Sequence, residues 1–129
     1  MRVITADYEV MVPPGKYWLC DPCYAVPSEI WMDLLNSCEF FERPIGKVES
    51  GGKVYQVLGF GTAYGDGLYY DQFSNAFPVD AGLIGLTPME LCKEEPFGAL
   101  LVEFTGETTC SCYEGVLKFG NHEINTGDE

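Results

Sequence analysis

Lys47-Val-Glu-Ser-Gly-Gly-Lys-Val-Tyr-Gln-Val-Leu-Gly-Phe60 is the stretch of sequence that decides the fold of this chain. Residues 53–60 alternate between two sets of side chains, with Val54 and Leu58 on one face of an extended backbone and Val57 on the other. A shorter strand-like run precedes them, and a Ser-Gly-Gly segment between the two runs supplies a turn. The sequence therefore predicts a β-hairpin.

Further strand-like runs lie on both sides of this hairpin. They are residues 3–12, 16–20, 82–86, 98–104, 108–113 and 116–119, most of them bounded by turns rich in glycine or proline. Asp66-Gly67 lies between residues 62–64 and residues 68–70, and this dipeptide is typical of a two-residue hairpin turn. A second hairpin is therefore predicted there.

One helix is expected. Apolar residues at positions 30, 31, 34, 35 and 38 share one helical face, and Ser28 is in position to act as the N-cap. Pro88–Cys92 is expected to form a single helical turn. The predicted fold is mainly β (α+β), with an antiparallel sheet that is rolled or closed as a barrel or sandwich, and one covering helix. Residues 1–124 are expected to form a single domain, followed by an acidic tail at 125–129.

Composition sets the broad class of the protein. The 129 residues are 47% hydrophobic, which is too apolar for a disordered chain, and no apolar run reaches the roughly 20 residues of a membrane-spanning helix. The N-terminus has no apolar segment of signal-peptide length, so we expect a cytoplasmic protein without a membrane partner. The net charge of −13 opposes direct binding to nucleic acid. It suits solubility, which is its plainest interpretation, and also cation binding or docking onto a basic protein partner. The sequence does not define an oligomeric state.

Glycines, tyrosines and carboxylates crowd together at Gly59–Asp71 and again at Val79–Gly82. The candidate ligand-binding residues in these segments are Tyr64, Asp66, Tyr69, Tyr70, Asp71 and Asp80. The rings of Tyr64 and Tyr70 flank a Gly-Asp-Gly turn. They could stack a planar ligand there, because glycine permits a close approach of the ligand to the backbone. A structural interpretation also stands, in which the rings fill a small core and the aspartates cap turns.

Four aspartates could offer the oxygen ligands that Ca²⁺ or Mg²⁺ takes: Asp21, Asp66, Asp71 and Asp80. Their spacing does not fit the twelve-residue calcium loop. We therefore predict neither a metal site nor a cofactor.

Six cysteines allow three interpretations. The pair Cys20 and Cys23, together with Cys110 and Cys112, could supply four thiolates to zinc, although neither half has the usual glycine-turned knuckle. A redox role would require the first pair at the start of a helix, and the predicted helix begins several residues later. The third interpretation is that the cysteines are reduced, partly buried thiols that act as small apolar residues.

No residue is predicted to be catalytic. His122 is the only histidine, and no motif supports its pairing with Cys23 or Cys112 as a nucleophile. The glycine pairs at 59–61 and 65–67 are not followed by a lysine and a helix, so the interpretations as a P-loop or a dinucleotide-binding loop both fail.

Three short motifs give this chain a resemblance to other proteins. They are Asp21-Pro-Cys-Tyr24, Thr62-Ala-Tyr-Gly-Asp-Gly-Leu-Tyr69 and Val79-Asp-Ala-Gly82. In these the chain resembles a group of small, functionally uncharacterised bacterial and bacteriophage proteins, over about residues 15–87. It departs from their pattern at Cys20, where the group has glycine, which argues further against a metal pair there. The resemblance implies a phage or mobile-element setting and transfers no activity.

Two functional hypotheses follow. The first is a non-catalytic phage-type binding protein in the host cytoplasm, which interferes with a host process such as antiviral defence. It would occupy a basic partner-protein surface or sequester a small ligand. The alternative is a small hydrolase or lyase that uses Asp66, Asp71 and Asp80, with or without a divalent cation.

Overall fold

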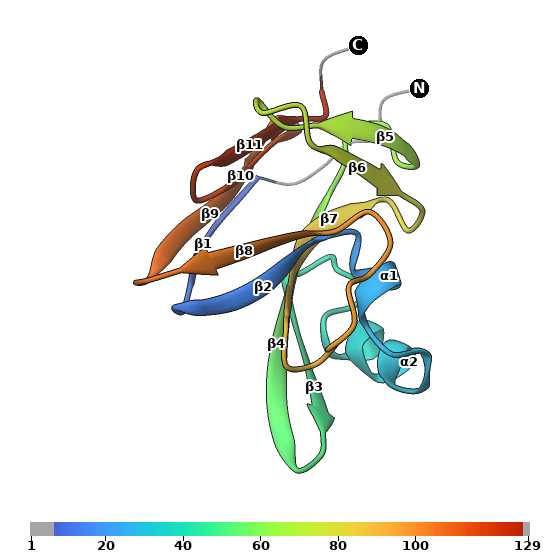
Figure 1. Cartoon of the computed structure of the whole chain (residues 1–129). Helices are drawn as coiled ribbons and strands as arrows, with labels where there is room; N and C mark the ends of the chain where they lie inside the picture. Colours follow the sequence, from blue (N-terminus) through green and yellow to red (C-terminus); the bar gives the residue numbers. More distant parts are fainter. Residues whose placement is uncertain (1–6, 128–129) are drawn as a thin grey trace.

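Two antiparallel sheets face each other across a shared core in the computed structural model, which describes residues 7–127 (Figure 1). The five-stranded sheet contains, in spatial order, β3 (Ile45–Ser50), β4 (Lys53–Gly61), β7 (Leu83–Pro88), β2 (Gly15–Cys20) and β8 (Leu100–Phe104). The four-stranded sheet contains β1 (Tyr8–Val12), β9 (Thr108–Tyr113), β10 (Val116–Phe119) and β11 (His122–Asn125). A separate hairpin of β5 (Gly67–Tyr70) and β6 (Ala76–Val79) lies at one end.

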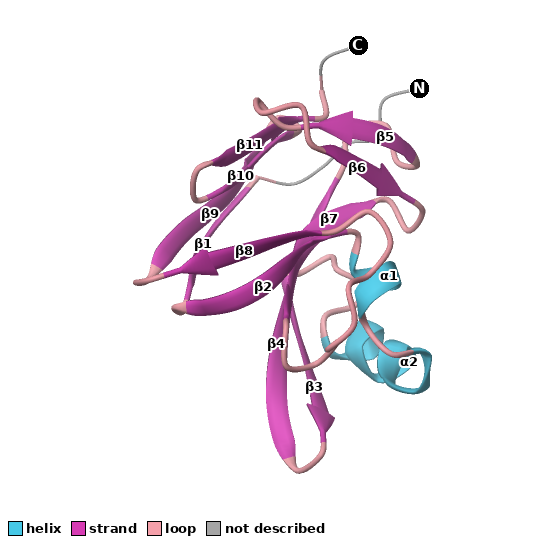
Figure 2. Cartoon of the chain, in the orientation of Figure 1, coloured by secondary structure: helices cyan, strands magenta, loops and turns pink. Residues whose placement is uncertain are grey.

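Two helices, α1 (Pro22–Ala25) and α2 (Ser28–Ser37), lie on the same side of the five-stranded sheet, away from the four-stranded sheet (Figure 2). The predicted antiparallel, mainly β fold with a small helical part is confirmed. The second helix, α1, was not expected, because it is only four residues long and shows no periodic apolar pattern.

The core is divided by the five-stranded sheet. On one face, Phe60 of β4 and Phe119 of β10 meet with their ring centroids 5.6 Å apart, within a cluster of buried residues from both sheets and the β5–β6 hairpin. On the other face, Leu34 of α2 packs in a second cluster with Val48 and Val57 of the β3–β4 hairpin. Each face of the sheet is therefore buried by a different layer.

The hairpin predicted at residues 47–60 is confirmed as β3 and β4, with Lys47 opposite Gln56. The predicted alternation of faces is also correct, since Leu58 lies in the core between the sheets and Val57 lies under α2. The strands predicted around residues 16–20, 82–86, 98–104, 108–113 and 116–119 are present as well. The first predicted strand is present from Tyr8, and its residues 3–6 lie outside the described part.

The hairpin predicted around Asp66-Gly67 is wrong. β5 pairs with β6, with Gly67 opposite Val79, and the chain between them turns at residues 71–75. The segment before Asp66 cannot pair with β5 because its polar groups are bonded elsewhere: Thr62 N–H donates to Gly82 O at 3.0 Å. β6 and β11 were not predicted.

Three smaller expectations also change. Ser28 is the first residue of α2 rather than its N-cap, a position held by Pro27 without any side-chain bond. Residues 88–92 form consecutive turns and no α-helix. The folded part extends beyond residue 124, because Thr126 is buried, donates to Gly115 O and accepts from Ala63 N–H at 3.0 Å.

Gly85 of β7 lies where β4 and β7 approach most closely. A Cβ atom at this position would stand 1.7 Å from the Leu58 carbonyl oxygen, so no side chain fits without moving the backbone. We expect Gly85→Ala to lower the free energy of unfolding by about 3 kcal/mol. Gly106→Ala, where no atom lies within 4 Å of the new Cβ, should stay within about 0.5 kcal/mol of the parent. Urea denaturation measures both, and equal losses would contradict this packing constraint.

Candidate functional site

The six predicted site residues lie on the β5–β6 hairpin and in the loops at its ends, but they do not form one cluster. Gly67 stands opposite Val79, so Asp66 and Asp80 flank the same end of the hairpin, and both are exposed. Asp71 follows the other end of β5, roughly 16 Å away along an extended chain. The carboxylates of the hydrolase hypothesis are therefore split between two places.

Asp21 organises the end of the hairpin near Asp80. Its carboxylate is fully buried and accepts backbone N–H bonds from Cys23 at 3.0 Å, Asp80 at 3.0 Å and Ala81 at 2.8 Å. The bond from Cys23 caps α1, which confirms the expected turn-capping role of Asp21. The other two bonds fix the loop between β6 and β7 against α1.

Tyr24 of α1 lies close to this loop. Burial, followed by the nearby charges of Cys23, Asp80, Asp21 and Asp66, raises the pKa of the Tyr24 hydroxyl. Within the described chain, neither exposed aspartate caps a turn with its own side chain, contrary to the structural interpretation offered above. Their carboxylates therefore remain available at the surface beside Tyr24.

Asp71 is buried at the opposite end of the hairpin, where it caps the β5–β6 turn as expected. Oδ1 accepts from the backbone N–H groups of Phe73 and Asn75 at 2.9 Å each, and Oδ2 accepts from Asn75 Nδ2 at 2.9 Å. Oδ2 also lies 3.0 Å from Nδ1 of His122, which the sequence did not link to this aspartate. Burial raises the pKa of Asp71, but its hydrogen bonds from Asn75, His122 and Phe73 outweigh burial and hold that pKa below its ordinary value.

The three tyrosines point in different directions. Tyr69 faces the core and donates to Gly65 O at 2.9 Å, while Tyr70 is exposed on the outer face of β5 and Tyr64 is half-buried before it. None of the six predicted residues lines the cavity beside β2 and β4 or the one beside β8 and β9. Within residues 7–127, the three rings therefore do not face one another across the Gly-Asp-Gly turn.

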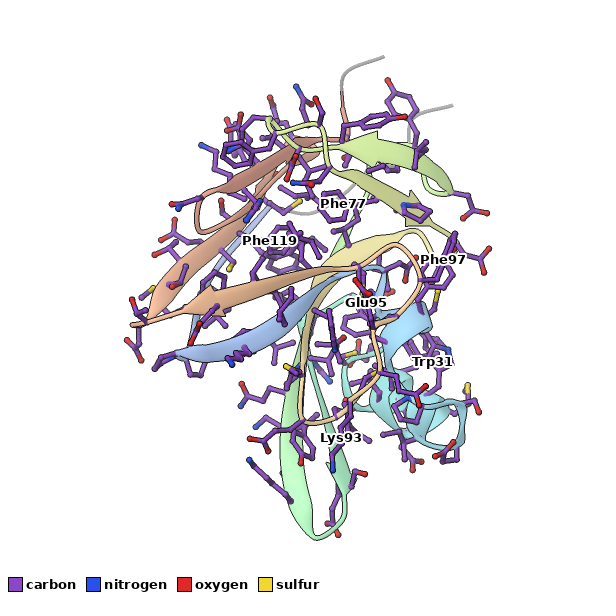
Figure 3. All side chains as sticks on the ribbon, in the orientation of Figure 1. Trp31, Phe77, Lys93, Glu95, Phe97 and Phe119 are labelled. Atoms are coloured by element: carbon purple, nitrogen blue, oxygen red, sulfur yellow. The ribbon has the colours of Figure 1, made fainter. Side chains whose placement is uncertain are left out.

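What the hairpin does present is an apolar outer face. Leu68 and Tyr70 are 53% and 54% exposed, and they stand opposite Pro78 and Ala76 across the hairpin. Phe97 is 69% exposed and packs edge-on against Tyr24, beside β6, whereas Phe77 and Phe119 point between the sheets (Figure 3). Leu68 and Phe97 were not among the predicted site residues. The alternation of residues 67–70 already put Leu68 and Tyr70 on one face, but the pairing that exposes this face was not foreseen.

The cysteines do not come together as a zinc site. Cys110 and Cys112 are buried between the sheets, whereas Cys20 lies with Trp18 and Ala25 on the helical side of the five-stranded sheet. All six cysteines are free thiols, and four are buried, as the third interpretation expected. Among residues 7–127, no group of three or more His, Cys, Asp and Glu side chains is arranged to hold a metal ion.

The position of the Cys-x-x-Cys segment differs from the sequence-based expectation. A helix does begin at the Cys-x-x-Cys segment, because α1 starts at Pro22 and is capped by Asp21. The environment nevertheless opposes thiolate chemistry. Burial, followed by the charge of Asp21, raises the pKa of the Cys23 thiol to about 12, whereas redox-active cysteines have lowered pKa values.

Comparison with known proteins found no matching family model, no matching curated protein and no matching solved structure. No helix in the described part of the chain is long and apolar enough to cross a membrane.

Removing the Asp21 carboxylate should destabilise the protein severely. Asp21→Ala leaves three backbone N–H groups without an acceptor, two of them in the β6–β7 loop, and we expect a loss of about 3 kcal/mol of unfolding free energy. Asp80→Ala removes an exposed carboxylate from the same loop and should change stability by less than about 0.5 kcal/mol. Urea titrations of the two variants test this contrast, which fails if Asp21→Ala is as stable as Asp80→Ala.

Asp71 should make the protein acid-sensitive. Because its pKa is lower in the folded state, its contribution to stability is complete above the unfolded value near 3.8 and is lost as the pH falls through the folded pKa. Asp71→Asn should be less stable than the parent near neutral pH, with the difference narrowing between about pH 5 and about pH 2. Unfolding measured across this range gives the two profiles. Parallel profiles would mean that Asp71 is not the titrating group.

Proposed function

We propose that this chain is a non-catalytic binding protein that docks the outer face of the β5–β6 hairpin onto a basic surface of a partner protein. In the phage setting implied by its motifs, this contact would interfere with a host process such as antiviral defence. One observation carries the proposal: exposed apolar side chains lie on the same hairpin as exposed carboxylates that no lysine or arginine neutralises in the described chain.

The apolar part of this surface favours a protein partner. Leu68, Tyr70, Phe73 and Phe97 are each more than half exposed, on or beside one small hairpin. Exposed apolar patches mark interaction sites on soluble proteins, and aromatic residues are enriched in protein interfaces. Burial of these side chains would supply the affinity.

The charge of the same region selects the partner. Residues 54–92 contain no lysine or arginine, and Asp66 and Asp80 lie exposed at one end of the hairpin. A basic partner is attracted over a distance by the net charge of −13, while an acidic partner or a nucleic acid is repelled. Binding should weaken as salt concentration rises.

The hydrolase alternative has less support. Its carboxylates stand at opposite ends of β5, and burial raises the pKa of the thiols of Cys20, Cys23, Cys92 and Cys110, which opposes their use as nucleophiles. The hairpin surface offers contact area rather than an enclosed site, which favours recognition of a protein over capture of a small molecule.

Site-directed photo-crosslinking tests the proposal. A photo-reactive phenylalanine derivative replacing Tyr70, in bacterial lysate, should crosslink to a basic protein, and one replacing the equally exposed Phe40 should not. Adding Leu68→Asp should reduce the crosslink from position 70 by about tenfold, because it removes the apolar contact of Leu68 and forces a carboxylate to lose its hydration there. The proposal is wrong if both positions capture the same proteins, or if Leu68→Asp and added salt leave the crosslink unchanged.

A further inference from the structure

A cavity of about 750 Å³ opens on the five-stranded sheet, away from the β5–β6 hairpin. Its floor is formed by Leu58 of β4, Leu86 of β7 and Tyr17 of β2, all of which are buried. Its walls come from the far part of β4, the β1–β2 turn and the turn after β7. Of the four-stranded sheet, Met11 and Val12 of β1 line the cavity. Its volume lies within the range of small-molecule sites.

The walls are mainly aliphatic. Met11 and Val54 are 51% and 60% exposed, and the other apolar wall residues include Ile45, Pro13, Pro14, Pro88 and Met89. Tyr17 donates its hydroxyl to Pro13 O at 2.8 Å, so its ring presents an apolar surface without a free polar group. Such a surface favours an aliphatic body in the ligand.

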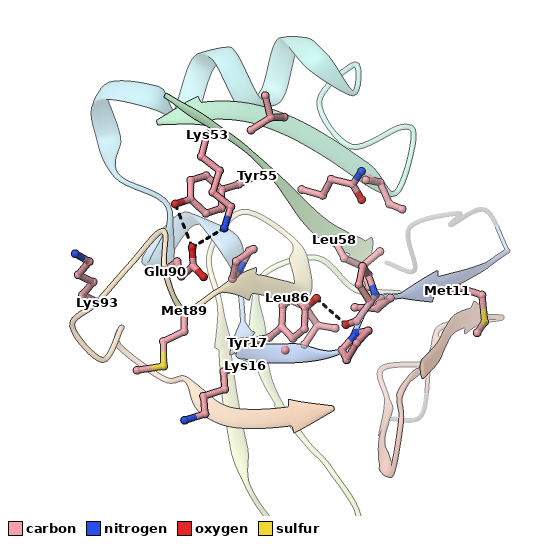
Figure 4. A pocket seen from close by; sticks show the side chains of 18 residues that line it. Met11, Lys16, Tyr17, Lys53, Tyr55, Leu58, Leu86, Met89, Glu90 and Lys93 are labelled. Atoms are coloured by element: carbon pink, nitrogen blue, oxygen red, sulfur yellow. Dashed lines mark hydrogen bonds and ion pairs between the residues drawn. The ribbon is translucent and has the colours of Figure 1, made fainter. Parts of the chain in front are cut away.

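Positive charge gathers around this cavity in a strongly acidic protein. Arg2 lies outside the described residues, which leaves six of the seven basic residues, and three of these six line the cavity: Lys16, Lys53 and Lys93. The only acidic residue in the lining is Glu90, so three lysines against one glutamate give a net charge of +2. In Figure 4, Lys53 lies beside Glu90, whereas Lys16 and Lys93 stand at the edge of the cavity.

Two of the three lysines are free to bind a ligand. Lys53 is already paired with Glu90 at 2.7 Å, but Lys16 and Lys93 make no ion pair within residues 7–127. A lysine attracts an anion as a point charge and does not need the planar partner that arginine prefers. The described lining includes no arginine and no helix N-terminus, the groups that most often bind phosphate.

From these observations we infer that the cavity binds an aliphatic monocarboxylate, with its chain on Leu58, Leu86 and Val54 and its carboxylate at the lysine-bearing edge, near Lys16 or Lys93. A single negative charge suffices for the two free lysines and is less strongly opposed by the acidic remainder of the protein than a dianion would be. This site is separate from the hairpin surface proposed to bind a partner.

Isothermal titration of the full chain with dodecanoate, below its micelle concentration, tests the inference. We expect saturable binding at one site and no binding of dodecyltrimethylammonium, which has the same chain and the opposite charge. Lys16→Gln combined with Lys93→Gln should weaken dodecanoate binding by about tenfold, and Val54→Asp should weaken it at least as much. Because these side chains are exposed, thermal melting should show that the variants remain folded.

Two matched variants serve as controls. Lys118→Gln removes a lysine outside the cavity, and Leu68→Asp alters the hairpin surface; neither should change dodecanoate binding. The inference is overturned if dodecanoate does not bind, if dodecyltrimethylammonium binds equally well, or if the double lysine variant binds like the parent. It is also overturned if an apolar peptide with a free C-terminus binds at this site and dodecanoate does not. Val54→Asp should leave the crosslink from position 70 intact, so the failure of one proposal can be told from the failure of the other.

Discussion

The buried carboxylate of Asp21 is the interaction on which the candidate surface depends. Asp21 directly follows β2, the strand that is hydrogen-bonded to both β7 and β8, so its backbone position is fixed by the sheet. From there its two oxygens hold α1 and the N–H groups of Asp80 and Ala81. A buried charge is tolerated only when its hydrogen bonds are made, so the loop after β6 has one favourable position. The β5–β6 hairpin enters this loop and is oriented by it.

The same need to satisfy polar groups separates what the sequence could predict from what it could not. The β3–β4 hairpin was predictable because the alternation of Val54, Val57 and Leu58 and the turn before them are local signals. The pairing of β5 was not, because it depends on Thr62 bonding to Gly82 and on Ala63 bonding to Thr126, far along the chain. An Asp-Gly pair between apolar residues carries no information about such distant acceptors.

The candidate site shows this limit most clearly. The sequence correctly drew attention to residues 59–82, but Asp21 reaches partners 59 and 60 residues away, and Asp71 meets a histidine 51 residues away. The lysine-lined cavity was missed for the same reason, since Lys16, Lys53 and Lys93 come from three separate segments. What local patterns predict is the existence of strands; which surfaces those strands expose is decided by long-range pairing.

The loop after α2 has a strained backbone, and it also supports the β3–β4 hairpin, which forms one wall of that cavity. Glu39, Phe40 and Phe41 have positive φ angles of 53°, 57° and 61°, which cost about 1 kcal/mol each for residues with a Cβ. Phe41 offsets this cost by packing on Gly59 of β4, where an added Cβ would stand 2.9 Å from its ring. The loop thus holds α2 on one face of the β3–β4 hairpin, while Val54 and Leu58 on the other face line the cavity. Lys16 of β2 lies at the cavity, and Asp21 directly follows the end of β2, roughly 17 Å away along the extended chain. One central strand therefore links the two proposed sites and keeps them apart.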